Sequence, residues 1–149
     1  MAASDRKLTI KYLCLALAQG IPLKQKIQLL AEIDINTALK KCGNINSLQV
    51  KKAIRWLDES NNNHIINFYD PLYPQQLKHI DTPPLVLFCK GDISLLNNNS
   101  VAIIGSRIAQ EYSHKVAIKF SKFFINIGIP IISGLARGID TTVAKSSVA

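Results

Sequence analysis

The sequence predicts an α/β protein: a small all-helical N-terminal domain over residues 1–63, followed by a Rossmann-like parallel-sheet domain over residues 64–149. Three observations lead to this fold class. Residues 8–60 carry apolar side chains at the three- and four-residue spacing of short amphipathic helices. Two short apolar runs, 101–104 and 129–133, flank another helical pattern and predict strands of a parallel sheet. An asparagine run at 61–63 separates the two patterns as a linker.

The N-terminal part is expected to form four short helices. The first covers residues 8–18, and Pro22 suits the first turn of the second. Asn36 is expected to cap a third helix over residues 37–42, which Gly43 ends.

Asn46 or Ser47 is expected to cap the fourth helix, which carries a basic stripe and the single tryptophan. The stripe consists of Lys51, Lys52 and Arg55. These side chains either contact nucleic acid or form a solvated helix face, and the solvated face is the preferred interpretation. Trp56 is interpreted as a core or domain-interface anchor in preference to a platform for stacked bases.

Two further strands are expected at residues 64–68 and 85–89, joined by a segment rich in tyrosine and proline. The prolines of this segment, at Tyr73-Pro74 and Pro83-Pro84, fix the direction of the backbone. Lys90 follows the second strand directly and could face a phosphate, although solvation is the preferred interpretation.

Residues 101–140 form the central pattern of the chain, a strand–loop–helix–strand–loop unit. The strand at 101–104 is expected to be buried on both faces. The helix after it carries one apolar stripe, with Gly128 as its C-terminal cap and Pro130 just beyond. The stripe consists of Tyr112, Val116, Phe120, Phe123, Phe124 and Ile127.

Both loops of this unit lie at the carboxyl ends of their strands, where open α/β sheets bind their ligands. Glycines let a backbone approach an anion closely, and the planar guanidinium of arginine suits phosphate. We therefore expect a phosphate-binding site made of Gly105, Ser106, Arg107, Ser133, Gly134, Arg137 and Gly138. The loops contain no pairing of residues that suggests acid–base or nucleophilic catalysis, so no catalytic residue is expected.

Three residues near these loops have other expected roles. Asp140 is interpreted as the cap of the next helix. Arg137 could contact phosphate, or it could instead pair with Asp140 or face solvent, and His114 is interpreted as a surface residue. A dinucleotide site is disfavoured, because the first turn has one glycine and the second strand ends in Ser133-Gly134, where an acidic residue is expected. No cofactor and no metal are expected.

Composition favours a globular, cytoplasmic protein with a polyanionic partner. The formal net charge is +8, and hydrophobic residues make up 48% of the chain. Cys14, Cys42 and Cys89 lack metal-site spacing and are expected to be reduced thiols. No apolar run is long enough to span a membrane. The apolar run at residues 12–18 imitates a secretory signal. Because Lys11 interrupts the apolar segment, an amphipathic helix is the preferred interpretation.

The two loop motifs resemble the DprA/Smf family of bacterial DNA-processing proteins. The similarity lies in Ile103-Ile-Gly-Ser-Arg107 and in Ile132-Ser-Gly-Leu-Ala-Arg-Gly-Ile-Asp140, and it extends upstream to about Ile65. The upstream residues that carry it are Asp70-Pro-Leu-Tyr-Pro74, Leu77, Pro83-Pro84 and Leu85-Val-Leu-Phe-Cys-Lys-Gly91. Two positions depart from the family pattern: Ser113 replaces a usual glycine, and Ala144 stands where a histidine is common.

The resemblance implies single-stranded DNA binding without catalysis, in DNA uptake and RecA-mediated recombination. It also implies RecA as a protein partner and a possible homodimer, with no membrane association. The resemblance implies that Gly105, Ser106 and Arg107, with Ser133, Gly134 and Gly138 nearby, line a pocket for DNA backbone phosphates. Phosphate recognition of this kind is independent of sequence and sensitive to salt.

Two alternatives stay open at this point. One is a Rossmann-like enzyme that binds a nucleotide or nucleoside phosphate with the same loops, and the other is a nonfunctional gene remnant. The family resemblance implies further strands beyond residue 149, so we expect the isolated chain to be truncated. An uncovered strand edge would then make it marginally stable or prone to aggregate.

Overall fold

The computed structural model describes residues 3–148, and the chain divides into two compact units, Met1–Asn97 (unit 1) and Asn98–Ala149 (unit 2). This division differs from the expected domain boundary after residue 63. The strands expected at 64–68 and 85–89 form, but they pack on the N-terminal helices and therefore extend unit 1. Each unit has its own hydrophobic core.

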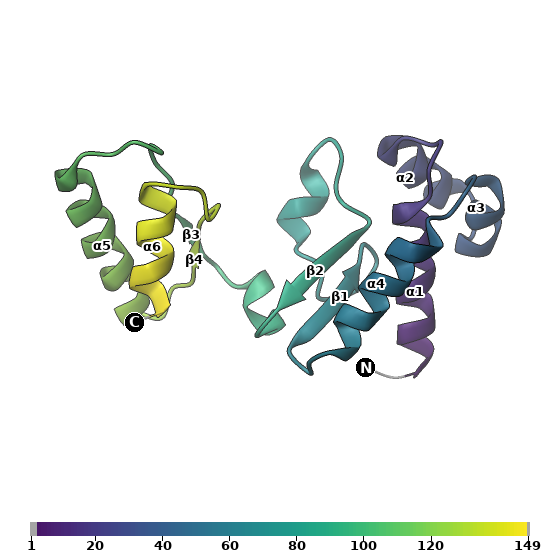
Figure 1. Cartoon of the computed structure of the whole chain (residues 1–149), viewed down its shortest axis with the longest axis horizontal. Helices are drawn as coiled ribbons and strands as arrows, with labels where there is room; N and C mark the ends of the chain where they lie inside the picture. The colour runs from purple at the N-terminus through teal and green to yellow at the C-terminus, as the bar shows by residue number, and fades with distance from the viewer. Residues whose placement is uncertain (1–2, 149) are drawn as a thin grey trace. The chain divides into compact units, whose positions relative to one another are not determined.

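The four helices expected in unit 1 are confirmed. They are α1 (Ala3–Leu17), α2 (Leu23–Glu32), α3 (Ile35–Lys41) and α4 (Ser47–Asp58), labelled in Figure 1. Pro22 directly precedes α2 as its N-cap residue. The expected cap of α4 is also confirmed, since the Asn46 side chain accepts a hydrogen bond from the backbone N–H of Gln49 at 3.1 Å.

The expected cap of α3 is wrong by two residues. Asp34, not Asn36, caps this helix, and its carboxylate accepts hydrogen bonds from the backbone N–H groups of Asn36 at 2.9 Å and Thr37 at 3.3 Å. A cap residue must directly precede the helix for its side chain to reach the second and third N–H groups. These bonds and one from the Thr37 hydroxyl hold the pKa of Asp34 below its ordinary value.

Strands β1 (Asn63–Asn67) and β2 (Val86–Lys90) form an antiparallel pair in which Ile65 lies opposite Phe88. Figure 1 shows this pair beside α4 and α1. Two short 3₁₀ helices, η1 (Gln75–His79) and η2 (Ile93–Asn97), follow β1 and β2 respectively.

The core of unit 1 contains large, fully buried side chains. Leu13 and Leu15 of α1, together with Tyr73 and Leu85 from the strand-connecting segments, are at most 1% exposed. The Tyr73 hydroxyl donates to the carbonyl of Pro84 at 2.8 Å, so its polar atom is satisfied within the core. Lys26 of α2 is also buried, and its ammonium donates to the carbonyls of Ala16 at 3.1 Å and Ala18 at 2.5 Å.

Unit 2 contains β3 (Val101–Ala102), α5 (Glu111–Asn126), β4 (Ile131–Ile132) and α6 (Ile139–Val148). Strands β3 and β4 are parallel and α5 connects them, so the expected strand–helix–strand unit is confirmed. The expected glycine cap of α5 is confirmed as well. Gly128 has a φ of +73°, and the N–H groups of Gly128 and Ile129 donate back to Ile125 and Phe124, which is the Schellman arrangement.

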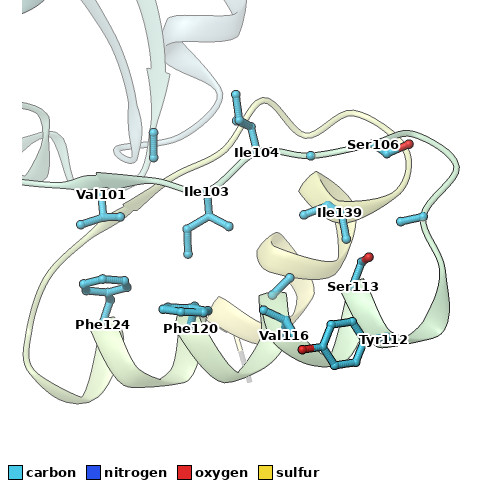
Figure 2. Close-up of a pocket in the computed structure, with 14 residues that line it drawn as sticks. Val101, Ile103, Ile104, Ser106, Tyr112, Ser113, Val116, Phe120, Phe124 and Ile139 are labelled. Carbon is cyan, nitrogen blue, oxygen red and sulfur yellow. The ribbon is translucent and has the colours of Figure 1, made fainter.

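The expectation that the strand at 101–104 is buried on both faces is wrong. The strand has only two residues, and Ala102 and Ile104 are exposed, Ile104 to 74%. The strand expected at 129–133 is likewise reduced to Ile131–Ile132, with Ile132 exposed to 58%. In Figure 2, Val101 and Ile103 point toward α5 while Ile104 points away from it. A two-stranded sheet with helices packed on one face buries only alternate residues.

The α/β fold class is therefore confirmed, with two separate two-stranded sheets in the described part of the chain. No helix within residues 3–148 is long and apolar enough to cross a membrane.

Candidate functional site

The two glycine loops of unit 2 contact each other through their backbones. The N–H of Ile139 donates to the carbonyl of Ser106 at 3.2 Å. Gly138 has a φ of +85°, and a Cβ added there would overlap the carbonyl oxygen of Ser106 and the backbone of Arg107. Only glycine fits at position 138, because it combines a left-handed backbone with direct contact between the loops.

Asp140 joins the same two loops through its carboxylate. One oxygen, Oδ1, accepts from the N–H of Gly105 at 3.3 Å, and Oδ2 accepts from the N–H of Gly134 at 3.1 Å. The residue is only 6% exposed. The interpretation of Asp140 as a helix cap is therefore wrong: it lies inside the first turn of α6, and its side chain bonds to the preceding loops.

Gly105 and Gly134 are explained by the close packing around Asp140. A Cβ at Gly105 would lie 2.8 Å from Cγ1 of Ile139, and a Cβ at Gly134 would lie 2.9 Å from Oδ2 of Asp140. Their N–H groups already bond to a carboxylate, which is an internal anion. Close approach of an external phosphate is thus not needed to account for either glycine.

The two serines of the expected site differ in their surroundings. The Ser106 hydroxyl donates to the carbonyl of Ile108 at 2.7 Å and accepts from the N–H of the same residue at 3.1 Å, which fixes the turn after β3. The Ser133 hydroxyl oxygen is buried and has no hydrogen-bond partner among the described residues.

Arg107 and Arg137 carry the positive charge of the loops, and both are exposed. Within residues 3–148 neither guanidinium forms an ion pair or a hydrogen bond. The alternative that Arg137 pairs with Asp140 is not realised, since that carboxylate bonds to the two glycine N–H groups. The structure thus brings together two loops that each present one solvated guanidinium.

His114 links α5 to α6. The interpretation of this residue as a plain surface residue did not include such a contact. The side chain is half-buried, and its Nδ1 lies 2.6 Å from the hydroxyl oxygen of Thr142. The Thr142 hydroxyl is in turn 3.2 Å from the carbonyl of Gly138. This contact holds the first turn of α6 beside the glycine loops.

An apolar cleft of about 550 Å³ lies next to the first loop, between β3 and α5. Figure 2 shows Phe120 and Phe124 below Val101 and Ile103, with Ser106 at the other end. The described residues contain no group of three or more His, Cys, Asp or Glu side chains placed to hold a metal ion. The chemistry available at the loops is therefore charge recognition by the two arginines.

Sequence reasoning identified both loops but not the residue that joins them. The signal was present: Asp140 follows directly on a glycine-rich turn, and it is the only acidic residue in either loop motif. A buried carboxylate needs donors, and closely packed glycine loops offer backbone N–H groups.

Comparisons with family models, curated proteins and solved structures all indicate the same family. The family model described as DNA recombination-mediator protein A matches residues 64–149, more than half of the chain. The DNA processing protein DprA of Bacillus subtilis is 44% identical over 77 residues, covering 51% of this chain and 26% of that protein. Protein Smf of Escherichia coli is 31% identical over 99 residues, covering 66% of this chain and 26% of that protein.

A solved structure, that of DprA from Streptococcus pneumoniae, shares the fold with a TM-score of 0.56 and 24% identity. The match covers 94% of this chain and 49% of that chain. The chain spans about a quarter of the length of the curated relatives it matches. With the family model covering both glycine loops, the chain belongs to the DNA recombination-mediator protein A family, the DprA/Smf proteins.

Proposed function

We propose that the chain binds single-stranded DNA through its phosphates, at the two loops of unit 2, and serves DNA uptake and RecA-mediated recombination. The observation that carries the proposal is the pair of exposed arginines, Arg107 and Arg137, on loops that Asp140 joins. Family membership supports DNA as the ligand, because relatives are named as DNA processing proteins.

The residues of the proposed site divide by role. Arg107 and Arg137 contact phosphate oxygens, for which a guanidinium supplies two parallel N–H groups. The Ser106 hydroxyl, whose proton is donated to the carbonyl of Ile108, holds the turn that presents Arg107, and Ser133 lies at the start of the second loop. Gly105, Gly134 and Gly138 let the loops pack against each other. Phosphate contacts of this kind fix the strand without reading its sequence.

The proposed activity is binding, not catalysis. In the described part of the chain, the one carboxylate at the loops, Asp140, is buried and bonded to two backbone N–H groups. A carboxylate engaged in this way is not free to move a proton to or from a ligand. RecA as a partner and a homodimer belong to the same proposal and rest on the family resemblance.

The test is fluorescence anisotropy of a labelled single strand of about 20 nucleotides, titrated with the chain across salt. Arg107→Ala is expected to weaken binding about 10-fold and to reduce the salt slope by about one, as for the loss of one phosphate contact. Arg137→Ala is expected to act in the same direction. Lys122→Ala is the matched control, because it removes one exposed charge of unit 2 from the far part of α5.

Equal weakening by Arg107→Ala and Lys122→Ala would contradict the proposal, since the affinity would then reflect net charge alone. Competition separates the enzyme alternative from the proposed function. Unlabelled oligonucleotide should displace the labelled strand, and mononucleotide at the same phosphate concentration should not. Displacement by mononucleotide would favour a nucleotide-binding pocket.

A further inference from the structure

Two aromatic residues of unit 1, far in sequence from the glycine loops, form a partly exposed pair. The rings of Trp56 on α4 and Phe88 on β2 meet edge to face, with centroids 5.5 Å apart and planes at 66°. Trp56 is half-buried, whereas Phe88 remains 51% exposed. An apolar ring held against a second ring and still half exposed offers a firm surface for a flat ligand.

The strand pairing places a positive charge beside this pair. Lys90 lies opposite Asn63 in the β1–β2 register, and the Asn63 side-chain amide donates to the carbonyl of Trp56 at 2.7 Å. Residues two apart on a strand share a face, so Lys90 lies on the same face as Phe88. Lys90 is exposed.

Helix α4 carries two more exposed cations close to Trp56 in sequence. Lys52 lies one helical turn before Trp56, and Arg55 lies next to Lys52 on the exposed surface of the helix. Two acidic residues follow Trp56: Asp58, the last residue of α4, pairs with Arg6 at 2.7 Å, and Glu59 is the C-cap residue of the helix. Three exposed cations, Lys52, Arg55 and Lys90, therefore lie within four residues of one or other ring in sequence, against one carboxylate, Glu59, that forms no ion pair among the described residues.

We propose that this Trp56–Phe88 surface, made of Lys52, Arg55, Trp56, Phe88 and Lys90, is a second binding site for single-stranded nucleic acid. A base stacks on the exposed ring of Phe88, and the three cations contact the phosphates on either side. Such surfaces combine stacking platforms with a positively charged path for the backbone. The charge favours a polyanion, and the exposed ring favours one that carries flat bases.

The site joins features that the sequence left apart. The basic stripe of α4, Trp56 and Lys90 each had a solvated or structural interpretation as the preferred one. Only the tertiary packing of α4 on the β1–β2 pair brings Trp56 and Lys90 near each other. The inference shares its ligand class with the proposed function but rests on a different unit, so each can fail alone.

Trp56 is the single tryptophan of the chain, so its emission reports on this surface directly. The experiment titrates an unlabelled single strand of about 20 nucleotides into the chain carrying both Arg107→Ala and Arg137→Ala. We expect saturable quenching of Trp56, with an apparent Kd that rises with salt. No quenching at strand concentrations that saturate the anisotropy signal of the unmodified chain would overturn the proposal.

Five substitutions, one of them a control, sharpen the test. Phe88→Ala should weaken binding about 5-fold or more by this readout, and Phe88→Tyr, which keeps the ring, should restore it. Lys90→Gln should weaken binding, and Glu59→Gln should tighten it, because the ligand is an anion. Tyr69→Ala, which removes another half-exposed aromatic of unit 1, is the matched control and should change nothing.

Two outcomes would overturn the proposal although the protein binds DNA. If Phe88→Tyr binds as weakly as Phe88→Ala, stacking is not involved. If polyglutamate of the same charge quenches Trp56 as strongly as the oligonucleotide, the surface recognises charge without bases. If Arg107→Ala abolishes the change in anisotropy of the labelled strand and the strand does not quench Trp56 emission, the proposed function is retained and this second site is rejected.

Discussion

Each of the two units is stabilised internally in a different way. Unit 1 buries large side chains almost completely, among them Leu13, Tyr73 and Leu85. Unit 2 has a core of small and medium side chains, Ala117, Ile139 and Val143, and leaves Phe120 and Ile132 more than half exposed. In place of a large core, unit 2 has backbone contacts between two glycine loops and one buried carboxylate.

This difference shows what the glycine motifs of unit 2 encode. Gly105, Gly134 and Gly138 each face another part of the same chain at a distance that excludes a side chain. Their residue type follows from packing within the protein, and in the function we propose the neighbouring arginines face the ligand. A glycine-rich loop therefore indicates close approach, and the structure decides whether the neighbour is a ligand or the protein itself.

The largest expected effect comes from Gly138→Ala. The new Cβ would overlap the Ser106 carbonyl and would also impose a side chain on a φ of +85°. We expect unit 2 to lose about 3 kcal/mol of unfolding free energy, while unit 1 stays unchanged. Hydrogen exchange followed by mass spectrometry measures this, with peptides of α5 and α6 compared against peptides of α1.

Gly128→Ala is the matched control for that prediction. Its φ is +73°, but an added Cβ meets no atom within 4 Å. The cost should be that of the left-handed backbone alone, about 1 kcal/mol. Equal losses of unfolding free energy for Gly138→Ala and Gly128→Ala would show that contact between the loops does not restrict position 138 to glycine.

Asp140→Asn should have the next largest effect. An amide keeps one acceptor oxygen and turns its NH₂ group toward one of the two glycine N–H groups, which loses its partner. We expect a loss of about 2 kcal/mol in unit 2, measured by the same exchange experiment. Asp58→Asn, which removes an exposed ion-paired carboxylate in unit 1, should cost less than about 1 kcal/mol. A loss from Asp140→Asn no greater than that would contradict the account of the loops.

The smallest of the three effects concerns Lys26, the buried cation of unit 1. Lys26→Met keeps the length of the side chain but leaves the carbonyls of Ala16 and Ala18 without a donor. Removing a buried charge offsets part of this loss, so we expect a net cost of about 1 kcal/mol in urea denaturation. Lys24→Met, an exposed neighbour on α2, is the control and should be close to neutral.

Lys26 also gives unit 1 a pH dependence with a definite sign. Burial lowers the pKa of the Lys26 ammonium in the folded state. Between this lowered pKa and the ordinary lysine value the unfolded chain binds more protons, so stability rises with pH in that window. The stability difference between the natural chain and Lys26→Met should therefore grow from neutral to alkaline pH. A difference that stays constant would show that Lys26 does not titrate in this window.

The sequence predicted unit 1 better than it predicted unit 2. Periodic apolar residues located α1 to α4, although α1 begins at Ala3 and not at the expected residue 8. Asn46 was one of two cap candidates for α4, with Ser47. The cap of α3 was missed because Asp34 and Asn36 are both good cap residues two positions apart. In unit 2 an all-apolar run implied burial on both faces, which requires neighbours that a two-stranded sheet does not supply.

The candidate sites were predictable only in part. Gly105-Ser-Arg107 and the second loop were located from their place after apolar runs. Their joining by Asp140 depends on tertiary contacts 35 and 6 residues apart in sequence, which local patterns do not record. The Trp56–Phe88 surface likewise depends on the packing of a helix against a strand.

The central claim is that Asp140, and not a ligand, occupies the backbone donors of the glycine loops, which leaves Arg107 and Arg137 for phosphate. The most direct measurement is hydrogen exchange by NMR at the amides of Gly105 and Gly134, with and without saturating single-stranded DNA. We predict that both amides are protected in the free protein and keep their protection with DNA bound, and that in Asp140→Asn the one that faces the side-chain NH₂ group exchanges freely. Protection that appears only when DNA is added would contradict the claim and assign these amides to the phosphate.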